Sequence, residues 1–158
     1  MFGRKKKTQT PTVASPAAGR IMDLEEVPDP VFSRKVMGDG FAVDLTDGQI
    51  TSPADGELVL LPDSLHAFAV RTPAGVEILV HIGIDTVKLK GEGFRAHRAV
   101  GDVLRRGDPV VSVDLDSVRD RVPSLITPVV ITNGTAFTVA ERHHEAGPGA
   151  PVLVLAAT

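Results

Sequence analysis

The sequence predicts an all-β protein, a compact antiparallel β-sandwich or barrel-like domain with one or two short helical turns. Short apolar runs rich in Val, Ile, Leu and Phe recur at close spacing, and Gly, Pro, Asp or Asn separates each run from the next. Long stretches with helical periodicity are scarce. Many short strands divided by turns are typical of sandwiches and barrels.

The expected strands begin near residue 41, and turn residues mark the gaps between them. Helical turns are expected around 30–37 and over 114–121, where Asp114 or Asp116 can cap the amino end. Residues 1–18 are basic and then rich in Thr, Pro, Ala and Ser, so we expect a flexible arm before a single domain at 19–158. The expected strands are 41–45, 49–52, 57–61, 66–71, 76–81, 94–97, 110–114, 128–132, 136–139 and 152–155.

The composition argues against several classes of function. A chain of 158 residues is long enough for one domain and too short for two ordinary ones. The formal charge of −3 and the absence of Trp and Tyr give no reason to expect a nucleic-acid partner. Cysteine is absent, which excludes disulfides and thiolate chemistry within this sequence. No apolar run approaches the roughly 20 residues of a membrane span, so a cytoplasmic location is expected.

Two histidines form the main candidate site. His66 and His81 stand on the two arms of an expected hairpin whose turn is 72–75. Pairing Arg71 with Val76 places His66 directly opposite His81, whereas a slip of one residue would turn His81 to the other face. Opposite Cβ atoms lie about 4.5–5.5 Å apart. We therefore expect the two imidazoles to converge on one small group.

The residues around this pair suit phosphoryl transfer. A neutral imidazole is a nucleophile, and the reaction otherwise needs donors placed around the phosphoryl oxygens. We expect His81 to be the nucleophile and His66 to supply a donor. Ser64 can fix the tautomer of His66, Gly83 permits close approach of another backbone, and Asp85 can orient a group.

Apolar residues are expected to surround the pair. A short cluster in 31–37 precedes the Gly-rich segment 38–40, and the expected hairpin register adds two residues to the histidine face. If these side chains are exposed, they form an apolar ring about a polar centre, which is typical of a protein docking site; burial in the core is the alternative. The candidate interface residues are Val31, Phe32, Val36, Met37, Phe68 and Leu79.

Five stretches of the chain carry a resemblance to a known family. They are residues 31–40, 52–56, 66–68, 76–94 and 125–130. Through them the chain closely resembles the glucose-family IIA component, or enzyme IIA, of the bacterial phosphoenolpyruvate-dependent sugar phosphotransferase system. The resemblance covers most of residues 20–155.

The resemblance implies a compact antiparallel β-sandwich that works as a phosphohistidine carrier. It implies that His81 accepts a phosphoryl group at Nε2 from the phosphocarrier HPr, with His66 as its partner in the site and Ser64 where relatives often have Thr. The group then passes to a cysteine of a IIB domain for sugar uptake. Because this sequence has no cysteine, the IIB domain is expected on another chain, a IIBC sugar permease at the membrane.

Further expectations concern cofactors, regulation and the amino terminus. No cofactor is expected to be required, although zinc could bind His66 and His81 together with a carboxylate from a partner. Regulatory targets of the unphosphorylated form are also expected. Some relatives carry an amphipathic membrane-seeking helix at the amino terminus, and this basic arm is too short for one.

Two other functions remain open at this point. One is a zinc-dependent peptidase on a related β-scaffold, which would use paired histidines and an Asp; such enzymes usually show a His-x-His pair, and this sequence has none. The other is a regulatory binding module in which both histidines are passive.

Overall fold

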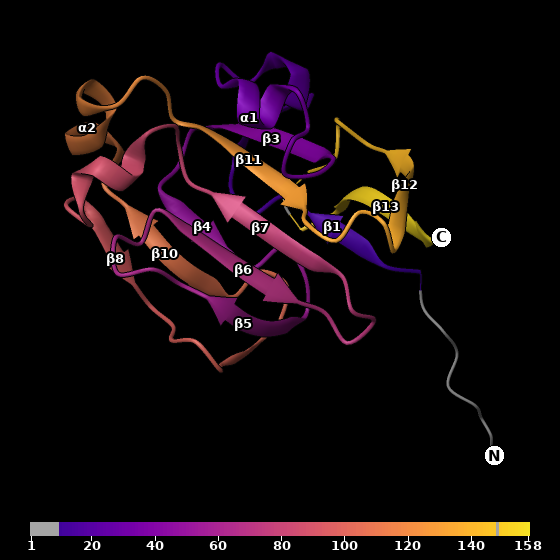
Figure 1. The fold of residues 1–158 in the computed structure, drawn as a ribbon. Helices are drawn as coiled ribbons and strands as arrows, with labels where there is room; N and C mark the ends of the chain where they lie inside the picture. Colours follow the sequence, from indigo (N-terminus) through magenta and orange to yellow (C-terminus); the bar gives the residue numbers. More distant parts are fainter. Residues whose placement is uncertain (1–9, 148) are drawn as a thin grey trace.

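A computed structural model describes residues 10–147 and 149–158, and strands in antiparallel sheets dominate it (Figure 1). The all-β prediction is therefore confirmed. The helical segments are η1 Leu24–Glu26, α1 Pro30–Ser33, η2 Thr86–Leu89, α2 Leu115–Val118 and η3 Arg119–Arg121. The strands are β1 Thr12–Ala14, β2 Gly19–Met22, β3 Gly40–Leu45, β4 Gln49–Thr51, β5 Gly56–Leu60, β6 Ala67–Arg71, β7 Glu77–His81, β8 Phe94–Ala96, β9 Val103–Leu104, β10 Pro109–Val113, β11 Ile126–Ile131, β12 Phe137–Arg142 and β13 Pro151–Ala157.

The largest sheet has the strand order β2-β3-β11-β7-β6-β5-β9, and its ladders are antiparallel. Smaller sheets of order β4-β10-β8 and β1-β13-β12 complete the described part of the chain. Strand β7 lies in the interior of the large sheet, hydrogen-bonded to β11 on one side and to β6 on the other. A residue at the end of β7 is therefore attached to a well-supported strand.

The two faces of the large sheet bury different clusters, because successive strand residues point to opposite faces. One face packs into the main core, with contributions such as Ile78 and Val129, together with residues of the smaller sheets. The other face packs Leu79 and Val130 against Phe32 of α1. In Figure 1 the α1 segment lies along β3 and β11, on the side away from β4 and β10. His81 follows Leu79 by two residues, so it belongs to the α1 face.

Both predicted helical turns are present, and an Asp begins each. The Asp29 carboxylate accepts a hydrogen bond from the Val31 amide at 2.9 Å, and Pro30 occupies the first turn, where its missing N–H costs little. The Asp114 carboxylate accepts from the Ser117 amide at 3.4 Å. Across 10–147 and 149–158, no helix has the length and apolar character needed to cross a membrane.

The predicted flexible arm does not extend to residue 18. Thr12–Ala14 forms β1 and pairs with β13, which lies at the opposite end of the sequence. Residues 1–9 of the predicted arm lie outside the described part of the chain. Strands β2 and β9 were also not predicted. These strands have two to four residues each, too few for an alternating pattern to be legible, and the sequence does not reveal the distant pairing of β1.

Candidate functional site

The hairpin that carries the site has a register one residue away from the predicted one. Arg71 pairs with Glu77, and Ala67 pairs with His81. The loop holds five residues rather than four, because Val76 belongs to it: its amide bonds the Thr72 hydroxyl at 3.0 Å and its carbonyl accepts from the Thr72 amide at 2.9 Å. Loop length sets hairpin register, so the extra loop residue shifts every pair.

This shift corrects the expected position of Phe68. Its side chain lies on the opposite face of β6 and is fully buried in the main core, so Phe68 is not a docking residue. Leu79 does share the face of His81, as expected, but it is buried in the second cluster. Both residues act in packing.

The two imidazoles nevertheless meet, as predicted. Their ring centroids are 5.2 Å apart, with an edge-to-face angle of 79°. His66 lies just before β6, and Leu65 before it adopts a left-handed conformation with φ of 58°. The His66 carbonyl still accepts a hydrogen bond from the Ile82 amide at 2.7 Å. Because His66 lies outside β6, its side chain does not have to follow the alternation of faces along that strand. The two rings therefore converge as predicted, although His66 and His81 are not a directly opposite pair in the hairpin.

Hydrogen bonds orient both rings. His81 Nδ1 lies 2.8 Å from the carbonyl oxygen of Gly83. A carbonyl can only accept, so Nδ1 carries the proton and Nε2 keeps a free lone pair. The Ser64 hydroxyl lies 2.5 Å from His66 Nδ1, which confirms the predicted contact between these two residues.

Gly83 and Asp85 shape the loop that follows His81. Gly83 has φ of 74°, and a Cβ there would lie 2.7 Å from Thr86 Cγ2 and 3.1 Å from the Ser124 carbonyl oxygen, so the expected close approach is present. Asp85 is exposed and also left-handed, with φ of 59°. Two non-glycine residues beside the histidines, Leu65 and Asp85, thus adopt a backbone conformation that is costly for L-residues.

Burial lowers the pKa of both imidazoles. For His66 desolvation is the larger cause, and the nearby His81 adds to it. For His81 desolvation also dominates, while the hydrogen bond to Gly83 and the charges of Asp29 and Asp85 act in the opposite direction. Both rings are therefore neutral at neutral pH, the form in which an imidazole is nucleophilic.

The apolar rim is smaller than predicted. Phe32 packs against His81, with ring centroids 5.1 Å apart, but only 4% of it is exposed, so it is a buried support rather than a docking residue. Val31, Val36 and Met37 are exposed by 42%, 71% and 38%. These three residues, which we call the apolar rim, are the members of the predicted set that reach the surface.

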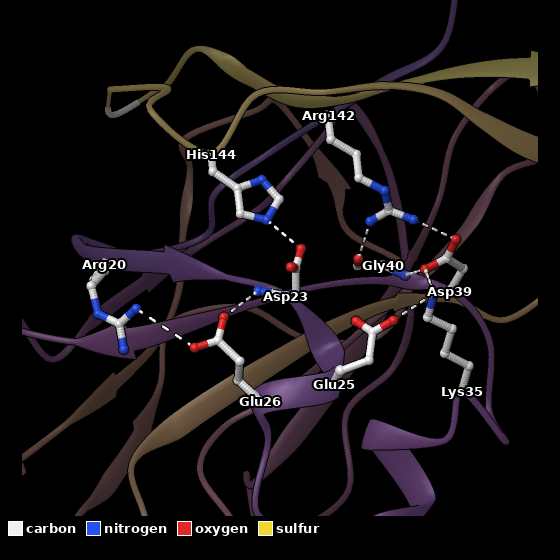
Figure 2. Close-up of polar contacts among 9 residues, drawn as sticks. All are labelled: Arg20, Asp23, Glu25, Glu26, Lys35, Asp39, Gly40, Arg142 and His144. Atoms are coloured by element: carbon white, nitrogen blue, oxygen red, sulfur yellow. Dashed lines mark hydrogen bonds and ion pairs between the residues drawn. The ribbon is translucent and has the colours of Figure 1, made fainter.

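An ion-pair network ties the α1 segment to the sheets (Figure 2). Arg142 of β12 donates to the Gly40 carbonyl at 2.7 Å and pairs with Asp39 at 2.5 Å. Lys35 lies 3.4 Å from Asp39 and 3.2 Å from Glu25. Burial alone would raise the pKa of Asp39, but the Arg142 hydrogen bond, the Gly40 amide and the charges of Arg142 and Lys35 lower it below its usual range. The segment carrying Phe32 is thus held from two sides.

The other three histidines contact residues other than His66 and His81. His97 Nε2 lies 2.6 Å from the Ser112 hydroxyl. His143 lies 2.9 Å from Glu141. His144 lies 2.7 Å from Asp23, as Figure 2 shows. Among the residues that the structure describes, no three His, Asp or Glu side chains are grouped to hold a metal ion.

Sequence reasoning missed two contributors to the site. Asp29 influences His81 electrostatically, and the pair Asp29-Pro30 was a readable helix-start signal. Thr127 of β11, which accepts a hydrogen bond from the Gly83 amide at 3.2 Å, gives no sequence signal, because an isolated Thr in a strand is ordinary.

Comparisons with known proteins agree with this geometry. The family described as phosphoenolpyruvate-dependent sugar phosphotransferase system, EIIA 1, matches residues 11–137. A "PTS system glucose-specific EIIA component" of Bacillus cereus is 46% identical over 136 residues, which are 86% of this chain and 82% of that protein. One from Halalkalibacterium halodurans is 43% identical over 149 residues, covering 90% and 86% of the two chains.

A solved structure gives the same result. The glucose permease IIA from Mycoplasma capricolum is 38% identical, with a TM-score of 0.87, and the match covers 93% of this chain and 96% of that one. The β-sandwich with two facing imidazoles at the end of an interior strand thus belongs to a component of the sugar phosphotransferase system. The chain is a member of the EIIA 1 family of that system.

Proposed function

We propose that this protein is a phosphohistidine carrier, in which His81 accepts a phosphoryl group from phosphorylated HPr and passes it to a cysteine of a IIB domain. One observation carries the proposal: the Gly83 carbonyl holds the proton on Nδ1 of His81, so Nε2 presents a lone pair at a half-buried ring. Membership of the EIIA 1 family supports the same reaction.

The transfer runs in two balanced steps. In the first, the Nε2 lone pair of His81 attacks phosphorus, a bond from Nε2 to phosphorus forms, and the donor's nitrogen–phosphorus bond breaks. In the second, a thiolate sulfur attacks the same phosphorus and the lone pair returns to Nε2. With the Ser64 hydroxyl donating to Nδ1 of His66, the Nε2–H of His66 donates to a phosphoryl oxygen as charge develops.

The apolar rim of Val31, Val36 and Met37 supports docking of the protein partners. Exposed apolar side chains around a polar centre form the desolvated part of many protein interfaces. The rim borders the α1 segment, whose Phe32 packs against the reactive ring, so a partner that covers the rim also approaches His81.

The sugar pathway is proposed from the relatives. Five of the curated relatives are named glucose-specific EIIA components, which supports a role in glucose uptake beside a IIBC permease at the inner face of the membrane. A Bacillus subtilis protein named "PTS system glucosamine-specific EIICBA component" is 44% identical over 122 residues, which make up 19% of it. We therefore propose that the membrane partner, rather than this chain, selects the sugar.

A regulatory role with zinc is also compatible with the site. Two neutral imidazoles supply two of the three or four ligands that zinc prefers, once the His66 proton moves from Nε2 to Nδ1, where the Ser64 hydroxyl can accept it. A carboxylate from a regulatory partner would complete the set. Phosphorylation would add up to about two negative charges and repel that carboxylate. Binding of a regulatory target would thus be restricted to the unphosphorylated protein. The peptidase alternative is set aside, because the chain belongs to the EIIA family.

Intact mass measurement after incubation with phosphoenolpyruvate, enzyme I and HPr tests the proposed carrier function. The protein should gain the mass of one phosphoryl group, and the adduct should be lost in acid. His81→Gln should gain none. His97→Gln is the matched control, because it removes an exposed imidazole bonded to Ser112, and it should be phosphorylated like the original protein. An unmodified protein, or a phosphorylated His81→Gln variant, would reject the proposal.

A further inference from the structure

The carbonyl that selects the His81 tautomer is itself held in place. Gly83 has no side chain, and its positive φ of 74° leaves its peptide groups free to turn unless something fixes them. The amide of the following residue, Ile84, donates to the Ser124 carbonyl at 3.0 Å. Because this amide and the Gly83 carbonyl belong to one planar peptide, that bond fixes one edge of the plane.

The preceding peptide plane is held at both ends by threonine hydroxyls. The Gly83 amide donates to Thr127 Oγ1 at 3.2 Å, and the Ile82 carbonyl accepts from Thr86 Oγ1 at 2.6 Å. Both threonines are fully buried, so neither hydroxyl can exchange its partner for bulk water. A buried amide left without an acceptor would be strongly unfavourable, which ties the position of Gly83 to the presence of these groups.

A third group, the Leu125 carbonyl, determines which hydrogen bond the Thr127 hydroxyl donates and which it accepts. Its proton goes to the Leu125 carbonyl, 3.1 Å away, because a carbonyl can only accept. The oxygen is then left to accept the Gly83 amide. A continuous series of hydrogen bonds thus runs from strand β11 through the loop to the imidazole of His81, and β11 is the strand that pairs with β7.

We propose that Thr127 and Thr86 are positioning residues for phosphoryl transfer: by holding the two ends of the Ile82–Gly83 peptide they aim the Gly83 carbonyl at His81 Nδ1 and leave Nε2 free to attack phosphorus. The inference rests on the proposed carrier function. It deepens that function by naming residues that act on the reaction without touching the phosphoryl group.

The variants are chosen to remove hydroxyls and keep shape. Thr127→Val and Thr86→Val preserve the branched side chain and delete one buried hydroxyl each, while Thr127→Ser keeps the hydroxyl and deletes the methyl group. Ser52→Ala is the matched control: Ser52 is also buried, and its hydroxyl also donates to a backbone carbonyl, that of Ala54 at 2.6 Å, in the loop between β4 and β5.

Nitrogen-15 NMR of the His81 ring gives the first readout, and it needs no phosphoryl transfer. The original protein, Thr127→Ser and Ser52→Ala should show a protonated Nδ1 and an unprotonated Nε2. Thr127→Val should show a mixture of tautomers, because the carbonyl no longer favours one of them. Thr86→Val should shift the tautomer ratio of His81 in the same direction. It serves as the second variant if Thr127→Val does not fold. An unchanged tautomer in the folded Val variants overturns the proposal.

Phosphorylation gives the second readout. Thr127→Val should accept the phosphoryl group with kcat lowered by about tenfold and KM for HPr unchanged, since the ring is misdirected and the apolar rim is intact. Part of its adduct should sit on Nδ1, and Thr127→Ser should restore the rate. A lower rate in Ser52→Ala, of equal size, would mean that the loss is a general effect of destabilisation and would overturn the positioning role. If the original protein accepts no phosphoryl group, the proposed function fails, whereas the tautomer measurement still tests the hydrogen-bond series.

Discussion

The ring of Phe32 lies 5.1 Å from the ring of His81, centroid to centroid, with an angle of 52° between their planes. Phe32 comes from the capped α1 turn, and His81 comes from the end of an interior strand. This contact joins the second hydrophobic cluster to the imidazole of His81. A substitution in the α1 segment should therefore change both the free energy of unfolding and the environment of the His81 ring.

Phe32→Ala and Met37→Ser should separate packing from docking. Phe32 is buried, so its truncation should cost about 3–5 kcal/mol of the free energy of unfolding. Met37→Ser changes a partly exposed side chain and should cost no more than about 0.5 kcal/mol, but it should raise KM for phosphorylated HPr. Urea denaturation and transfer kinetics measure the two effects. A strongly destabilised Met37→Ser protein would show that Met37 belongs to the core.

His66→Gln should slow donation more than acceptance. Glutamine keeps a hydrogen-bond donor but cannot become cationic as negative charge shifts from His81 to the incoming thiolate. Loss of one preorganised group of this kind typically lowers a rate by about 10²–10³. Quench-flow measurement of the two half-reactions provides the comparison, with His97→Gln as the control. Equal slowing of both half-reactions, or a folded but wholly unreactive variant, would contradict the assigned roles.

The pKa of His81 should respond to the carboxylates around it. Asp29 and Asp85 favour the protonated ring, so Asp85→Asn should lower the already depressed pKa of His81 further. NMR titration of the ring provides the measurement. Asp47→Asn, which changes an exposed turn carboxylate away from the site, is the control and should leave the His81 pKa unchanged. An upward shift in Asp85→Asn would contradict this electrostatic account.

The lowered pKa values of His66 and His81 should also make the free energy of unfolding depend on pH. The unfolded chain binds protons on His66 and His81 at about pH 6.5, whereas the folded protein binds them only at lower pH. In that window the unfolded state holds more protons, so the free energy of unfolding should fall as pH falls below about 6.5. Urea denaturation across this range should show a shallower dependence for the double variant His66→Gln, His81→Gln. An unchanged dependence would mean that other groups cause it.

Arg142→Met should weaken the network that holds the α1 segment, by about 1 kcal/mol at neutral pH. Because the pKa of Asp39 is lowered in the folded protein, the stability it contributes is present above about pH 3.9 and lost as pH falls through the folded value. The difference between the variant and the original protein should therefore shrink in acid. Arg95→Met, on an exposed position of β8, should show no such pH-dependent difference.

Much of the fold could be predicted because its strands are local features. Short apolar runs and turn residues marked β3, β10 and β11 to within two residues of their ends. The helical turns at α1 and α2 were also predicted, with an Asp cap at α2, whereas the Asp29 cap of α1 was missed. Strands β1, β2 and β9 were not, because so few residues carry no periodicity and the pairing of β1 with β13 is a property of the folded chain.

The convergence of the His66 and His81 rings was predicted correctly, and the register of the hairpin that carries them was predicted incorrectly. The pairing of Ala67 with His81 follows from Val76 joining the loop, which no residue type in the turn dictated. Phe32 and Phe68 were expected near the surface, and both are buried, because apolar residues give the same signal in a core as in an interface. Support from Thr127 depends on a neighbouring strand and could not be anticipated.

The attachment of His81 to an interior strand has a kinetic consequence. Its backbone pairs with β6 in the sheet, and its ring is hydrogen-bonded to the Gly83 carbonyl, so Nε2 cannot swing from one place to another. A carrier with its cargo on a long flexible arm can visit two distant partners in turn. In the proposed phosphoryl transfer, the donor and the acceptor must each bind at the same place, and the donor must leave before the acceptor can bind. The rate of turnover should therefore be limited by how quickly the bound donor protein is replaced by the acceptor protein.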